Sequence, residues 1–124
     1  MANPTVIGQS RDAGTTVLTY EFTILNGATV SDAVEIQIGA EIVGIITPAA
    51  ITGTALSFQS SVDGTTYNNV YSYDDTADLS IAIAASKDVS IDPSILCGRS
   101  NLKIVSNGAE GATRKILLLT RTIN

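Results

Sequence analysis

The chain has 124 residues, of which 44% are hydrophobic, 15% charged and 5% aromatic, and its formal net charge is -5. This length predicts a single domain with one core. The acidic balance and the scattering of only seven basic residues disfavour both nucleic-acid and membrane partners, so we expect neither.

The N-terminal segment, residues 1–14, has no basic start followed by an apolar run, and no later stretch approaches the length of a membrane span. We expect synthesis in a cytosol-like compartment, with this segment as an extended arm. Cys97 is the single cysteine, which excludes an internal disulfide framework.

Apolar and polar residues alternate through residues 15–25, where Leu18, Tyr20 and Phe22 share one face, and this pattern predicts a strand. A second strand is predicted over residues 34–38. Residues 42–46 are apolar on both faces and stop before Pro48. Because a small antiparallel sheet usually has one wet face, we expect another subunit to cover the outer face of this strand.

Residues 56–71, LSFQSSVDGTTYNNVY, predict a hairpin in which Leu56, Phe58, Ser60 and Val62 face the core and Asp63-Gly64 forms the turn. An acidic loop follows. The run 79–86 also suits a helix, but its alternation favours a strand.

Short strands are predicted around Val89 and Ile91 and around residues 102–105, and residues 95–98 are expected to close one end of the core. The last strand, 114–123, is apolar on both faces from residue 116 to 119. The pattern is therefore typical of an all-β, single-domain antiparallel β-sandwich or jelly roll over residues 1–124, with about eight or nine short strands.

Three patterns could carry chemistry. Ser100 and Lys103 have the S-x-x-K spacing of a catalytic pair, but on a strand this spacing places them on opposite faces. Asp74, Asp75 and Asp78 could bind calcium, although a solvated acidic loop is the more common meaning of such a cluster. We therefore expect no enzyme activity, no metal site and no cofactor.

Tyr67, Tyr71 and Tyr73 could form an aromatic platform for a sugar ring, which makes a carbohydrate- or receptor-binding module the alternative function. An ordinary strand surface explains the same tyrosines, because this residue type is common in strands.

The order of the apolar strand at 42–46, Thr47-Pro48-Ala49 and the stretch F-x-x-S-x-D-G-T-T-Y at 58–67 resembles small β-rich virion proteins of tailed bacteriophages. The resemblance extends over about residues 34–119, and the best-defined members are head decoration, or cement, proteins. It implies a sandwich fold without a catalytic site, a homotrimer on the capsid surface of the virion, assembly in the host cytoplasm and the major capsid protein as partner.

The apolar strands and the N-terminal segment supply the candidate contacts for such a role, because a cement protein must bury subunit surface. The candidate interface residues are Thr5, Val6, Ile7, Ile42, Val43, Ile45, Ile46, Leu117, Leu118 and Leu119.

Overall fold

A computed structural model describes residues 6–12, 15–37, 39–72, 77–96 and 98–123, and every regular element in these ranges is a β-strand. The predicted all-β class is therefore confirmed. Within the same ranges no helix is long and apolar enough to cross a membrane.

Twelve strands are formed by the described residues, more than the sequence predicts, because five of them have only two residues. They are β1 (Val6–Asp12), β2 (Thr15–Ile24), β3 (Val34–Glu35), β4 (Glu41–Ile46), β5 (Ala55–Ser61), β6 (Asn68–Asn69), β7 (Tyr71–Ser72), β8 (Ala77–Asp78), β9 (Ile81–Ala82), β10 (Asp88–Ser90), β11 (Asn101–Ser106) and β12 (Arg114–Ile123).

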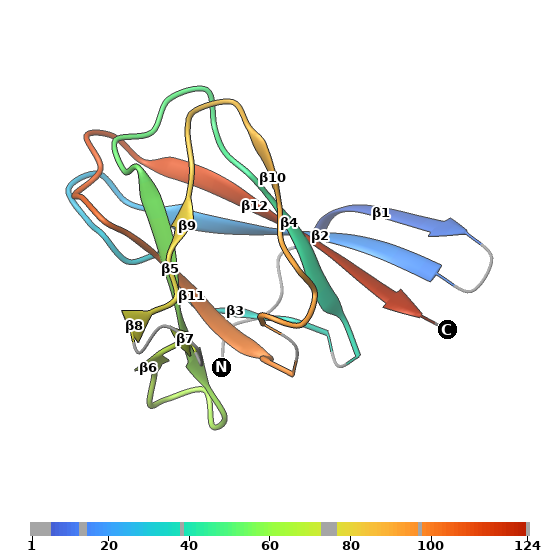
Figure 1. Ribbon diagram of the computed structural model, residues 1–124. Helices are drawn as coiled ribbons and strands as arrows, with labels where there is room; N and C mark the ends of the chain where they lie inside the picture. The colour runs from blue at the N-terminus through green and yellow to red at the C-terminus, as the bar shows by residue number, and fades with distance from the viewer. Residues whose placement is uncertain (1–5, 13–14, 38, 73–76, 97, 124) are drawn as a thin grey trace.

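The strands form two antiparallel sheets and a small ribbon (Figure 1). Sheet A has the order β1-β2-β12-β4-β10. Sheet B has the order β3-β11-β5-β6, with β9 also pairing with β5, and β7 pairs with β8 as a separate ribbon. In sheet A, β12 lies between β2 and β4, so this sheet joins strands from the N-terminal and C-terminal parts of the chain.

The core is one cluster of apolar side chains contributed by both sheets. Leu18, Tyr20 and Phe22 of β2 are buried, as their alternation predicts, and they share this cluster with Phe58 of β5. The Tyr20 hydroxyl accepts a hydrogen bond from the Gln37 N–H at 3.0 Å, which satisfies the polar end of this buried ring. Both sheets therefore bury one face against the same core.

The predicted hairpin is present, with Gln59 opposite Asn69 in a register centred on Gly64, whose φ is +78°. A positive φ at this position suits glycine and explains the Asp-Gly pair. The prediction that Val62 faces the core is wrong, because this side chain is fully exposed at 102%. The strand ends at Ser61, one residue before Val62, and the turn begins there with a hydrogen bond of 2.8 Å from the Ser61 hydroxyl to the Asp63 carboxylate.

The largest difference from the sequence analysis lies near the N-terminus. Val6–Asp12, expected to belong to an extended arm, forms β1 and pairs with β2 of the same chain. The strand predicted over 34–38 is reduced to β3, and the strand predicted over 79–86 is reduced to β9. Strand length in these segments depends on the partner strand available rather than on alternation alone.

Candidate interaction surface

Strands β4 and β12 lie side by side in sheet A and carry most of the candidate interface residues. Ile42, Ile45 and Leu118 are buried in the chain's own core, with at most 1% exposure. Ile45 is opposite Leu118 in the register, so both point to the same, inner side of the sheet. These three residues are therefore not available to a partner, and we remove them from the candidate interface.

The neighbouring positions on β4 and β12 face outward. Leu117 is opposite Ile46, and Leu119 is opposite Gly44, whose missing side chain leaves room for the leucine. Leu117, Leu119 and Ile46 are half-buried. Val17 of β2 reaches the same face and is 38% exposed. We name these four residues, Val17, Ile46, Leu117 and Leu119, the outer patch.

Val43 occupies an irregular position in β4. The register passes from Leu119 opposite Gly44 to Thr120 opposite Ile42, so Val43 has no partner residue on β12. Such a β-bulge changes the alternation of faces along a strand. This irregularity explains why alternation in the sequence cannot assign residues 42–46 to the two faces of the sheet.

Two ion pairs flank the outward leucines of β12, and their residues Glu21 and Arg121 lie opposite Leu117 and Val17 in the register of β2 and β12. Lys115 Nζ lies 3.2 Å from Glu21 Oε1, and Arg121 Nη2 lies 3.9 Å from Glu41 Oε2. Along β12, Lys115 and Arg121 therefore stand at either end of the outward leucines. An apolar centre with a charged margin is the usual anatomy of a protein–protein contact.

The remaining interface candidates lie near the N-terminus. Thr5 lies outside the described residues, whereas Val6 and Ile7 belong to β1. Val17 was not among the predicted interface residues, although its position next to the inward Leu18, on the opposite face of β2, was a usable signal.

The alternative ligand face lies on the other side of the molecule's core, around sheet B. The Lys103 ammonium lies 4.4 Å from the centroid of the Tyr67 ring, so a cation already occupies one face of this ring. Burial, followed by the nearby Asp63 charge, raises the pKa of Tyr67. Tyr71 is 59% exposed, and Tyr73 lies outside the described residues. Lys103 therefore covers one face of the Tyr67 ring, and Tyr71 is the more exposed of the two described candidate tyrosines.

The polar residues weighed as catalytic or calcium-binding candidates contact other side chains of the same chain. The Ser100 hydroxyl oxygen accepts a hydrogen bond from the Asn101 amide at 3.4 Å, while Lys103 contacts Tyr67. Asp78 accepts a hydrogen bond from the Asn69 amide at 3.3 Å, and Asp74 and Asp75, the other two aspartates of the acidic loop, lie outside the described residues. Across the described part of the chain, His, Cys, Asp and Glu form no group of three that could hold a metal ion.

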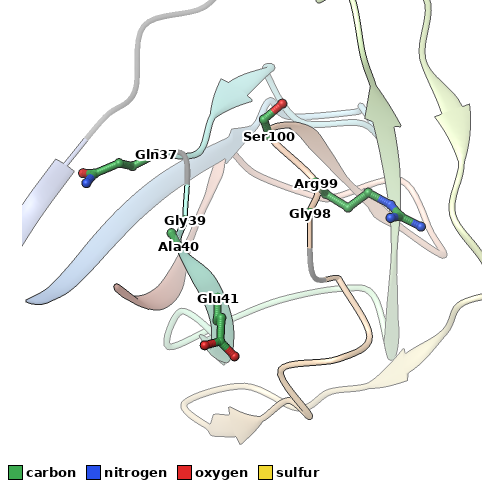
Figure 2. Close-up of a pocket in the computed structure, with 7 residues that line it drawn as sticks. All are labelled: Gln37, Gly39, Ala40, Glu41, Gly98, Arg99 and Ser100. Atoms are coloured by element: carbon green, nitrogen blue, oxygen red, sulfur yellow. The ribbon is translucent and has the colours of Figure 1, made fainter. Parts of the chain in front are cut away.

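A cavity of about 360 Å³ opens between the segment preceding β4 and the segment preceding β11 (Figure 2). Figure 2 shows the side chains of Glu41 and Arg99 at its margin pointing in different directions. Much of the remaining lining is glycine, alanine and backbone, and Ser100 is the one candidate catalytic residue among the lining residues.

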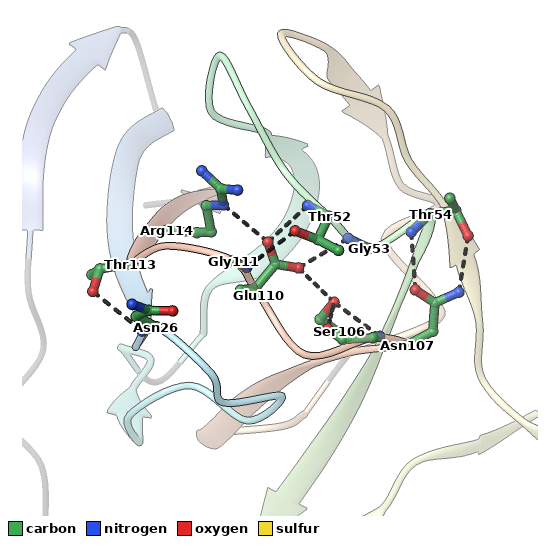
Figure 3. Close-up of polar contacts among 11 residues, drawn as sticks. Asn26, Thr52, Gly53, Thr54, Ser106, Asn107, Glu110, Gly111, Thr113 and Arg114 are labelled. Carbon is green, nitrogen blue, oxygen red and sulfur yellow. Dashed lines mark hydrogen bonds and ion pairs between the residues drawn. The ribbon is translucent and has the colours of Figure 1, made fainter.

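The buried carboxylate of Glu110 connects two loops through hydrogen bonds (Figure 3). Oε1 accepts hydrogen bonds from the Thr52 N–H at 2.8 Å and from Arg114 Nε at 3.0 Å. Oε2 accepts from the Gly53 N–H at 2.9 Å and from the Ser106 hydroxyl at 2.8 Å. Burial raises the pKa of Glu110, but these four hydrogen bonds outweigh it and lower the pKa overall. All four contacts are internal, so Glu110 has a structural role.

A comparison of the sequence with protein-family models and with curated proteins finds no match.

Proposed function

We propose that the chain is a non-enzymatic decoration, or cement, protein of a tailed-bacteriophage head. The outer patch is the observation that carries this proposal, because it gives the sheet an apolar outward face bordered by ion pairs. The resemblance of the hairpin stretch to phage virion proteins supports the same role. The partner is the major capsid protein, and the protein acts on the outer surface of the virion.

The mechanism is contact area rather than chemistry. A protein that binds the assembled lattice, but not the free capsid subunits, stabilises the assembled state by mass action. Burial of Leu117, Leu119 and Ile46 against a capsid subunit or a neighbouring copy supplies the apolar part of the contact. The resemblance adds the proposal that the protein is a homotrimer at local three-fold positions.

Binding to undecorated capsids tests the proposal. The purified protein is expected to sediment with such capsids, and Leu119→Gln is expected to weaken this binding by at least tenfold. Val62→Gln is the matched control, since Val62 is an exposed apolar residue on the hairpin turn and lies outside the patch. Circular dichroism and thermal melting show whether each variant keeps the parent fold.

Two results would count against the proposal. If the protein is absent from a mass-spectrometric inventory of virions and does not sediment with capsids, the function is wrong. If Leu119→Gln and Val62→Gln bind equally well, the outer patch is not the contact surface.

A carbohydrate- or receptor-binding module is the second candidate function. Its specific support is the exposed Tyr71 next to a chain of amide hydrogen bonds, in which Gln59 donates to Asn69 at 3.2 Å and Asn69 donates to Asp78. Amides and an aromatic ring together are a common surface for sugars. Glycan-array binding that is lost in Tyr71→Ala would favour this function, and a flat array would exclude the sugars on it.

A further inference from the structure

Among the described residues, no strand pairs with the outer backbone edge of β1, which is long. It has seven residues and lies at the end of sheet A, paired on one side with β2. Figure 1 shows the β1–β2 hairpin extending from one side of the fold, away from sheet B. In an antiparallel strand, every second residue directs its N–H and C=O away from its partner. About half of the β1 backbone groups therefore point to the free edge.

The other described sheet edges are much shorter. At the opposite end of sheet A, β10 has three residues, and the strands β3, β6 and β9 at the margins of sheet B have two each. Very short edge strands are one way in which proteins prevent unwanted pairing between sheets. Within the described residues, β1 is the edge that lacks this protection.

The length of the edge argues for a second copy of the same chain. No other described edge in this chain could pair with more than three of the seven residues of β1, whereas β1 of another molecule matches it fully. An antiparallel pair of identical strands has a two-fold axis, so each strand offers the other the same donors and acceptors.

We propose that two copies of this chain associate through antiparallel pairing of their β1 edges, which joins the two A sheets into one continuous sheet. The inference does not depend on the proposed function. It uses backbone groups at the edge of sheet A, whereas the proposed capsid contact uses the outer face, so both contacts can exist in one particle.

A bulge lies between Val6 and Gly8, so the regular pairing positions of β1 are residues 8–12, and the register that pairs all five of them places Ser10 on the two-fold axis. Arg11 is then opposite Gln9 of the second copy, and Asp12 is opposite Gly8 of the second copy. No like charges lie directly opposite one another in this register, so it carries no charge penalty.

Light scattering on the purified full chain is the first test. We expect a mass of twice the 12.9 kDa of one chain, or of six chains where the proposed trimers are also joined in pairs through β1. A monomer or an isolated trimer at the highest soluble concentration would overturn the proposal.

Two proline variants locate the contact. Gln9 and Ser10 are adjacent, so one N–H points to β2 and the other to the free edge. Proline removes the donor, so in one of Gln9→Pro and Ser10→Pro we expect the mass to fall to half while the melting temperature stays near that of the parent. Retention of the parent mass by both variants would overturn the proposal.

Cysteine cross-linking provides a test that does not require a destabilising change. Directly opposite residues in an antiparallel pair have Cβ atoms about 4.5–5.5 Å apart, close enough for oxidation to link cysteines near the axis. Single cysteines at positions 8, 9, 10 and 11 in a Cys97→Ser background should therefore cross-link strongly at one position, with Ser10→Cys expected to be the best. Equal or absent cross-linking at all four positions would contradict the pairing.

Discussion

Leu119 lies over Gly44 on the outer face of sheet A, where a Cβ atom on Gly44 would come within 3.3 Å of Leu119 Cδ1. The two residues are opposite one another in the register of β12 and β4. The absence of a side chain on Gly44 therefore leaves room for the Leu119 side chain. This contact is half-buried rather than buried, which separates Leu119 from its neighbour Leu118 in the core.

Alanine substitutions of Leu118 and Leu119 are expected to have different consequences. Leu118→Ala should lower the free energy of unfolding by about 2–5 kcal/mol, because it removes a fully buried side chain from the core. Leu119→Ala should lower it by about 1 kcal/mol or less and should instead weaken binding to capsids. Urea unfolding measures both effects on stability. Equal losses of stability would mean that the outer face is packed as tightly as the core.

The buried hydrogen bonds of Glu110 predict that even a nearly isosteric substitution of this residue will strongly lower the free energy of unfolding. In Glu110→Gln, an NH₂ group would face the Gly53 N–H and the charge on Arg114 would lose its partner, so we expect a loss of about 2–4 kcal/mol. Glu21→Gln is the matched control at the exposed Lys115 pair, with an expected loss below about 1 kcal/mol. Denaturant unfolding of both variants checks this difference. Similar losses of stability would argue against a stabilising role of the Glu110 hydrogen bonds.

Gly53 is expected to be intolerant of even a methyl group. A Cβ at this position would collide with Ser106 Oγ and lie 3.3 Å from Glu110 Oε2, so Gly53→Ala should cost about 1–3 kcal/mol. Gly108→Ala is the control, because nothing lies within 4 Å of the added carbon, and its effect should stay within about 0.5 kcal/mol. Thermal unfolding of the two variants distinguishes close packing from a general effect of replacing a loop glycine.

Stability is expected to fall in acid. The backbone N–H groups of Thr66 and Thr65, followed by the Ser61 hydroxyl, lower the pKa of Asp63 from 3.8 to about 2. The pKa of Glu110 is also lowered in the fold. A carboxyl group whose pKa is lower in the folded state contributes stability above its unfolded pKa, and this stability is lost as the pH falls through its folded pKa.

The urea midpoint should therefore be nearly constant above about pH 5 and should decline from about pH 4 toward pH 2. In Asp63→Asn, the decline should be shallower, since one of the responsible groups no longer titrates. An identical pH profile for this variant would show that the turn does not contribute to the acid sensitivity.

The sequence was sufficient to predict secondary structure where the alternation of apolar residues and the turn residues were unambiguous. The inward face of β2 and the hairpin centred on Gly64 were both predicted, because strands alternate with a period of two and Asp-Gly favours a turn with positive φ. The β1 strand was not predicted. Its sequence, VIGQSRD, has no regular apolar alternation, and it is a strand because β2 pairs with it along almost its whole length.

For the outer patch, too, the sequence determined one part and the tertiary structure another. Sequence alone determined that residues 42–46 and 116–119 are too apolar for a sheet with an ordinary wet face, and that the domain is all-β. Only the tertiary structure decided that Ile45 and Leu118 enter the core while Ile46, Leu117 and Leu119 form an outward patch with Val17. The physical reason is that β4 contains a bulge and β12 lies between β2 and β4, and neither the bulge nor this long-range register is encoded in local periodicity.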